Sequence, residues 1–185
     1  MRWQILVSVL SVVVLFSCNS KINSEKYSEV QNKGSEIANI TQTILLANVG
    51  KAIKKGGPEY AVEFCNLKAS FITDSLNLVN NCTISRHSAK NRNAGNMLNG
   101  EMEKSIWEIF EKTNAKDTVV QSKGKLVFYK PIKIASPACL KCHGNPESDI
   151  NASTFLKIQK LYPNDLAIGY KMNDLRGVWK IEFEL

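Results

Sequence analysis

The run VWKIEFE at residues 178–184 alternates, from Trp179 onward, between bulky apolar and charged side chains. Successive side chains of a β-strand point to opposite faces, so Trp179, Ile181 and Phe183 would share one face and the charged residues the other. Such a strand belongs to a sheet that buries one face in a core. The chain is therefore predicted to end in an amphipathic strand of a mainly antiparallel sheet.

Further strands are expected upstream of this run. The turn Asn173-Asp174-Leu175-Arg176 separates it from one preceding apolar segment, and the turn SKGK at 122–125 joins two others. These segments are rich in β-branched and aromatic residues, which favour strands, and a glycine-containing turn between two of them favours a hairpin. The expected strands are residues 82–88, 118–121, 126–134 and 166–172.

Helices are expected to occupy the first half of the chain. Apolar residues from Ile37 to Ile53 recur at helical spacing, up to the sequence Lys54-Lys55-Gly56-Gly57-Pro58. Cations in a last turn, glycines that end a helix and a proline that begins the next predict one helix ending and another starting there. The second helix would reach at least Ala69. Two later helices are expected at 101–113 and 154–161, so the order of elements predicts an α+β fold.

Composition limits the class of protein and its partners. The chain has 185 residues, 44% hydrophobic and 22% charged, which suits one globular domain with additional terminal segments. The formal net charge of +7 is compatible with an anionic partner or membrane surface, although a solvated basic face is the simpler interpretation. No segment resembles a nucleic-acid-binding module, so nucleic acid is not an expected partner.

The N-terminus has the pattern of an export signal. The apolar run Ile5–Phe16 has twelve residues, whereas spanning a bilayer takes about 20, and it fits the apolar region of a secretory signal. Leu15-Phe16-Ser17-Cys18 resembles a bacterial lipobox, in which the cysteine becomes the lipidated first residue. An ordinary signal peptide with an incidental cysteine, or an uncleaved anchor, is the alternative.

We therefore expect three segments. Residues 1–17 would be a lipoprotein signal peptide, residues 18–35 the lipidated Cys18 with a flexible polar tether, and residues 36–185 the folded domain. The protein would be exported and held at a lipid bilayer by its acylated N-terminus, in the periplasm or at the surface of a bacterial cell.

Cys139-Leu140-Lys141-Cys142-His143 is a CxxCH motif, which is typical of covalent c-type haem attachment. Two thiols at this spacing can reach the two vinyl groups on one side of a porphyrin, and the adjacent imidazole then lies beneath the iron. A redox CxxC expects a thioredoxin-like setting that the sequence lacks, and a zinc site needs four ligands that adjacent Cys142 and His143 cannot easily share. A disulfide is the remaining alternative. The motif predicts one haem c, with His143 as an axial ligand.

The second axial ligand is less directly indicated. The candidates are Cys65, Cys82, His87, Met97, Met102 and Met172. Ala61 and Ala69 lie one turn before and after Cys65 on the same helical face, so a flat macrocycle could approach the helix closely there. A buried structural cysteine, or a disulfide between Cys65 and Cys82, explains the same residues equally well.

Several segments occur in an order that resembles a known family. They are Gly57-Pro58, Ala61-Val62-Glu63-Phe64-Cys65, Ser85-Arg86-His87-Ser88, Arg92-Asn93 with Asn96, Pro131-Ile132, the CxxCH motif with Gly144, and the run Tyr162 to Tyr170. Together these resemble the bacterial PAS-like c-type haem family, over about residues 36–185. Its members are similar to a stand-alone cyanobacterial cytochrome and to extracytoplasmic sensor domains of some histidine kinases. Two departures occur, His87 where threonine is expected and Ala94 where proline is expected.

The resemblance implies a PAS-like antiparallel sheet with N-terminal helices and a single haem. It also implies that Cys65 is the thiolate ligand opposite His143. Arg86 and Arg92 are candidates for pairing with haem propionates, because guanidinium matches carboxylate geometry, and Asn93 is a candidate haem contact beside them.

A haem with both axial positions filled is expected to sense redox state or a gas and to signal to a separate protein. A low-potential electron carrier is the alternative. An enzyme such as a peroxidase needs an open distal site with acid and base groups, and the sequence shows no such set.

Overall fold

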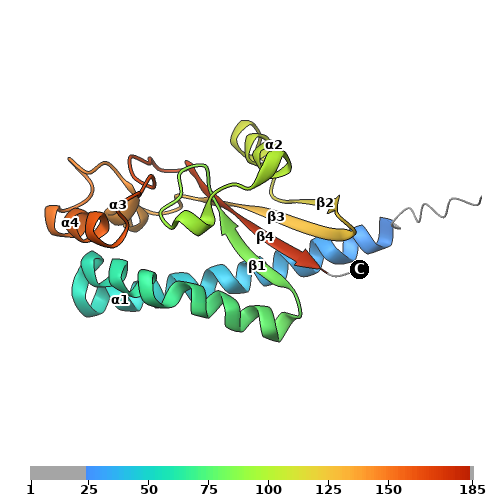
Figure 1. Ribbon diagram of the computed structural model, residues 1–185, viewed down its shortest axis with the longest axis horizontal. Helices are drawn as coiled ribbons and strands as arrows, with labels where there is room; N and C mark the ends of the chain where they lie inside the picture. Colours follow the sequence, from blue (N-terminus) through green and yellow to red (C-terminus); the bar gives the residue numbers. More distant parts are fainter. Residues whose placement is uncertain (1–23, 184–185) are drawn as a thin grey trace, which may run out of the picture.

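The computed structural model describes residues 24–183, and over this range the chain is an α+β protein, as predicted. Four strands form one antiparallel sheet in the order β1-β4-β3-β2. Figure 1 shows α1 along one side of the sheet and α2 on the other. The elements are α1 (Ser24–Asn80), β1 (Thr83–His87), the 3-10 helix η1 (Ala94–Asn96), α2 (Gly100–Lys112), β2 (Thr118–Ser122), β3 (Lys125–Lys133), α3 (Pro137–His143), α4 (Ala152–Leu161) and β4 (Leu175–Phe183).

Helix α1 consists of two arms that meet at a sharp kink. Gly56 and Gly57 leave helical geometry, and Gly57 has φ 73° and ψ −175°, a conformation that only glycine adopts readily. Pro58 follows directly and begins the second arm, as the sequence predicted. The two arms therefore run side by side in opposite directions beneath the sheet (Figure 1).

The first arm starts earlier than expected, and the predicted flexible tether is wrong from Ser24 onward. Residues 24–35 are helical, and Val30 and Gly34 are buried within them. Its inward-facing residues recur at intervals of three or four, so even a mostly polar segment presents one face to the sheet; they are Tyr27, Val30, Gly34 and Ile37.

The predicted signal peptide and Cys18 lie outside the described residues. No helix within residues 24–183 is long and apolar enough to cross a membrane.

The core has one cluster on each face of the sheet. On the α1 side, Trp179 and Ile181 of β4 pack with Leu126 and Phe128 of β3, which confirms the alternation in residues 178–183. On the α2 side, Trp107 and Phe110 pack against β3 and β4 residues, including Val127, Tyr129 and Val178. The sheet is thus covered on both faces, and its second face mixes apolar residues with Lys180 and Glu182.

Residues 166–172 do not form the predicted strand. Gly169, with φ 72°, interrupts the segment, and its backbone groups bond to loops instead of to the sheet. The N–H groups of Gly169 and Tyr170 donate to the carbonyls of Gly144 and His143, at 2.8 and 2.9 Å. This segment therefore wraps the C-terminal end of α3 and holds it in place.

Gly34→Ala is expected to destabilise the protein by about 1 to 3 kcal/mol through overpacking. An added methyl group would overlap Cγ of Phe128 and lie 2.7 Å from two more of its carbons. Gly50→Ala is the matched control in the same helix, because nothing lies within 4 Å of its Cβ position. That control should stabilise the protein by about 0.5 to 1 kcal/mol through helix propensity. Urea unfolding measures both changes, and an equal effect of the two substitutions would contradict the close packing at Gly34.

Candidate functional site

The CxxCH motif forms the short helix α3 at the end of the molecule where α1 turns back (Figure 1). Pro137 begins the helix, where its missing N–H costs nothing. Cys142 packs against a cluster formed by Val62 of α1 with Ile150 and Ile158, whereas Cys139 packs against Ile134, Ala167 and Tyr170. Both thiols are free, so the structure does not contain the alternative disulfide.

The imidazole of His143 has two polar contacts at Nδ1, and the shorter of them determines its tautomer. Its Nδ1 lies 2.8 Å from the carbonyl oxygen of Ala167. A carbonyl oxygen can only accept a hydrogen bond, so Nδ1 must carry the proton, and Nε2 keeps its lone pair. Burial, followed by the charges of Arg176 and Arg92, holds the pKa of His143 well below its usual range. His143 is therefore a neutral imidazole in the tautomer that a metal-binding histidine adopts when its other nitrogen donates to a backbone carbonyl.

Arg92 links α3 to the 165–170 segment through hydrogen bonds. Its guanidinium pairs with both carboxylate oxygens of Asp165, at 3.1 and 3.0 Å, and also donates to the carbonyls of Cys142 (2.7 Å) and Ala167 (3.2 Å). The carbonyl of Ala167 is the one that receives the His143 N–H. Arg92 thus positions the histidine through Ala167, and its predicted propionate contact stays a prediction.

Cys65 lies on the second arm of α1, where its thiol interacts electrostatically with that of Cys142 in the motif. Burial raises the pKa of its thiol, and the charges of Arg86 and Arg92 oppose that rise. Burial is also the main cause that raises the pKa of Cys142 to about 11, and Cys65 contributes to it. Ala61 and Ala69, which flank Cys65, are buried. The fold therefore brings Cys65, Arg86 and Arg92 to the motif.

Arg86 lacks a carboxylate partner among the described residues. It projects from β1, and its guanidinium carbon lies 5.5 Å from the ring centroid of Trp179. Burial lowers its pKa, and interactions with Cys65 and Tyr162 oppose this effect. An arginine buried without a carboxylate is costly unless an anion accompanies it. This environment suits either a Cys65 thiolate or a carboxylate from a bound group.

The other candidate ligands lie elsewhere. His87 is paired with Glu103 of α2 through Nδ1, at 2.5 Å. Met97, Met102 and Met172 are exposed, and the free thiol of Cys82 packs against the core cluster on the α1 side. Asn93 caps η1, where its side chain accepts from the N–H of Gly95. The structure thus gives none of these residues a contact with the motif.

The His87 and Glu103 pair predicts a pH dependence of stability. Burial alone would raise the pKa of Glu103, but hydrogen bonds from His87, the Asn99 N–H and Lys180 outweigh it and lower the pKa from 4.5 to about 2. Because the folded pKa is depressed, the stabilisation is complete above about pH 4.5 and is lost as the pH falls towards 2. It amounts to about 3 kcal/mol at neutral pH.

Glu103→Gln should therefore be less stable than the wild type at pH 7, and the difference should shrink below pH 4.5. Glu101→Gln is the control, because that carboxylate lies in the same helix with its side chain 88% exposed. Chemical denaturation at pH 7 and pH 3 measures both variants. A Glu103→Gln deficit that does not depend on pH would contradict the assignment.

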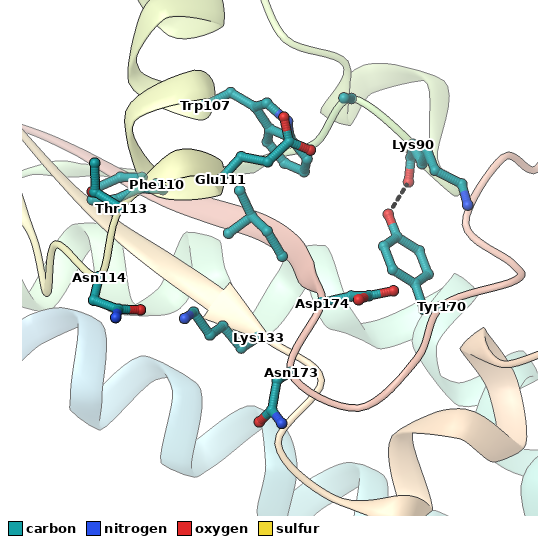
Figure 2. A pocket seen from close by; sticks show the side chains of 12 residues that line it. Lys90, Trp107, Phe110, Glu111, Thr113, Asn114, Lys133, Tyr170, Asn173 and Asp174 are labelled. Carbon is teal, nitrogen blue, oxygen red and sulfur yellow. Dashed lines mark hydrogen bonds between the residues drawn. The ribbon is translucent and has the colours of Figure 1, made fainter.

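A separate cavity of about 460 Å³ lies between α2 and the loop before β4. Figure 2 shows Trp107, Phe110, Lys133 and Tyr170 among its walls. The cysteines of the motif do not line it. Tyr170 connects the two regions, because its ring also stands edge-on to His143 with centroids 6.3 Å apart.

Residues from outside the motif complete the site, and sequence reasoning did not assign them roles. Asp165, Ala167 and Tyr170 belong to the run that carried the family resemblance, which was the available signal. Arg176 was expected only as a turn residue, yet its Nε lies 3.3 Å from Nδ1 of His143. Nothing in its local sequence indicates this contact, because Arg176 reaches the motif only after the 165–170 segment has wrapped α3.

Among residues 24–183, no group of three or more histidine, cysteine, aspartate or glutamate side chains is placed to hold a metal ion. A tetrahedral zinc site needs four such ligands. The zinc alternative for the CxxCH motif therefore finds no further ligands in the described part of the chain.

Comparison with known proteins supports the fold. The crystal structure of the cyanobacterial heme-protein Tll0287 is similar, with a TM-score of 0.63 and 18% identity, over 88% of this chain and 97% of that chain. A comparison with curated proteins gives no match. A family model described as Tll0287-like matches residues 17–183. This match spans most of the sequence and confirms the resemblance, so the chain belongs to the Tll0287-like family.

Proposed function

We propose that this protein binds one haem, attached by thioether bonds from Cys139 and Cys142 and ligated by His143. The observation that carries the proposal is the Nδ1–H of His143 donating to Ala167, because it leaves Nε2 available at the end of a CxxCH helix. Membership of the Tll0287-like family and the fold shared with a heme-protein support it. Each thiol would add across one vinyl group, with sulfur bonding to one carbon and hydrogen to the other.

The residues around the motif suit such a group. Apolar side chains of α1 and α4 flank Cys142. Arg86, which has no carboxylate partner among the described residues, would provide a cation for one propionate, and Arg92 would contribute a second contact while it stays paired with Asp165. When bound, the haem would supply a one-electron redox centre whose iron can also bind a diatomic gas. The protein would orient the axial imidazole, exclude water and hold opposite charges near the carboxylates.

We further propose Cys65 as the ligand opposite His143. Its position near Cys142, with Arg86 and Arg92 favouring the thiolate, supports this assignment over His87 and Met172. An anionic thiolate stabilises ferric iron, so the potential should be low. Such a thiolate would be a labile ligand, because reduction of the iron or protonation of the sulfur would weaken its bond and leave a position for a gas.

This chemistry favours a redox or gas sensor, with a low-potential electron carrier as the second candidate. The sensor would be exported and tethered to a bacterial membrane through Cys18, and it would act on a separate redox or signalling protein. The site has no acid and base pair arranged for catalysis among the described residues, so a non-enzymatic role is proposed.

Absorption and electron paramagnetic resonance spectra of the haem-loaded protein test the ligand and the role. The wild type should give a low-spin ferric signal with thiolate character, and Cys65→Ala should lose it. Cys82→Ala is the matched control and should keep it, because Cys82 is half-buried against the core cluster on the α1 side and has no contact with the motif. A thiolate signal that survives Cys65→Ala would overturn the ligand assignment. Carbon monoxide binding after reduction favours the sensor, whereas reversible reduction without ligand exchange favours the carrier.

A further inference from the structure

Arg176, at the start of β4, is fixed against His143 by several contacts. Its Nε lies 3.3 Å from Nδ1 of His143, and its Nη1 donates to the hydroxyl of Ser88 (3.3 Å) and the carbonyl of Lys90 (3.4 Å). Its guanidinium also stacks on Tyr170, 5.5 Å from the ring centroid. These contacts hold a planar cation at the edge of the imidazole that faces away from Nε2.

The charge of Arg176 is not neutralised locally. Arg92 has a bidentate partner in Asp165, but no described carboxylate lies within ion-pair distance of Arg176. Burial lowers the pKa of Arg176 to about 10, which still leaves it protonated at neutral pH. Because both side chains are half-buried, the charge of Arg176 acts on the histidine more strongly than it would in water, and the charges of Arg92 and Arg86 act in the same direction.

We propose that Arg176 is a positioning residue that sets the reduction potential of the haem through His143. The inference rests on the proposed function. Nδ1–H already donates to Ala167, so the Arg176 Nε–H approaches the ring as a second positive group. Its positive charge disfavours ferric iron, which would carry one more positive charge than ferrous iron. Arg176 should therefore raise the potential of a centre that a thiolate would otherwise hold low.

Three variants of the haem-loaded protein separate charge from shape. Arg176→Gln removes the charge, Arg176→Lys keeps it without the planar fork, and Lys171→Gln removes one charge from an exposed residue nearby. Potentiometric titration should show a more negative midpoint for Arg176→Gln. The ferric to ferrous ratio at a fixed potential should rise about tenfold, which corresponds to about 59 mV for one electron. Arg176→Lys should recover most of the shift, and Lys171→Gln should match the wild type.

The outcomes distinguish this inference from the function on which it rests. Wild-type protein that takes up no covalent haem would overturn the proposed function. If haem is attached, a wild-type midpoint in Arg176→Gln overturns the inference. Equal shifts in Arg176→Gln and Arg176→Lys also overturn it, because the contacts rather than the charge would then be responsible. Thermal unfolding of each variant is recorded in parallel, and a second neutral substitution, Arg176→Met, provides the measurement if Arg176→Gln does not fold.

Discussion

Phe128→Ala is expected to lower the free energy of unfolding by about 3 to 5 kcal/mol, the range for removing a buried aromatic ring. Phe128 is 0% exposed, and its ring lies between the sheet and α1 at the point where Gly34 permits close approach. The loss would be a large part of the total stability of a domain of this size, which is about 5 to 15 kcal/mol. Urea denaturation followed by circular dichroism measures it.

Phe71→Ala is the matched control for this prediction. It deletes the same ring from α1, but Phe71 is 70% exposed, so its stability should change by no more than about 0.5 kcal/mol. The double variant Gly34→Ala with Phe128→Ala gives a sharper test, because the new methyl group can occupy space that the ring has left. Its loss should be smaller than the sum of the single losses. Additive losses would contradict direct packing of Gly34 on Phe128.

His143→Ala is expected to abolish the low-spin spectrum of the haem-loaded protein. The substitution removes the proposed axial imidazole and its hydrogen bond to Ala167. His87→Ala is the matched control, because these are the two histidines of the chain and His87 is held by Glu103 on the other side of the sheet. Electron paramagnetic resonance of the ferric proteins measures the change. Loss of the low-spin signal in His87→Ala but not in His143→Ala would reverse the ligand assignment.

The parts of the fold that were predictable from sequence depend on local patterns. The alternation of Trp179, Ile181 and Phe183 reflects the two faces of a strand, and the Gly56-Gly57-Pro58 signal reflects backbone geometry. Each acts within a few residues, so each can be recognised without knowing what packs against it. The same holds for the spacing of Cys139 and Cys142.

The failed predictions depend on partners that are distant in sequence. The segment 24–35 is mostly polar, and its helix is stabilised by Phe128 and other residues more than ninety positions away, which occupy the space beside Gly34. Residues 166–172 have strand-like composition, but the N–H groups of Gly169 and Tyr170 donate to carbonyls at the end of α3 instead of to a neighbouring strand. Tertiary contacts overrode local propensity in both cases.

The site was predictable in the same uneven way. The motif predicts Cys139, Cys142 and His143 as haem-binding residues and the family resemblance predicts Cys65, and these assignments stay predictions. Three features follow only from the folded arrangement of α3 and the 165–170 segment. They are the tautomer of His143, the hydrogen bonds of Arg92 to α3 and the contact of Arg176 with His143. They concern orientation and charge, and neither is encoded in residue spacing.

Covalent attachment of haem is the central claim, and the most direct test is the intact mass of denatured protein produced with a c-type maturation system. The wild-type chain is expected to be heavier by one haem, and the haem absorption should remain on the chain after acid and organic extraction. The Cys139→Ala, Cys142→Ala double variant should show neither. A wild-type chain of unmodified mass, or haem that passes wholly into the organic phase, would contradict the account.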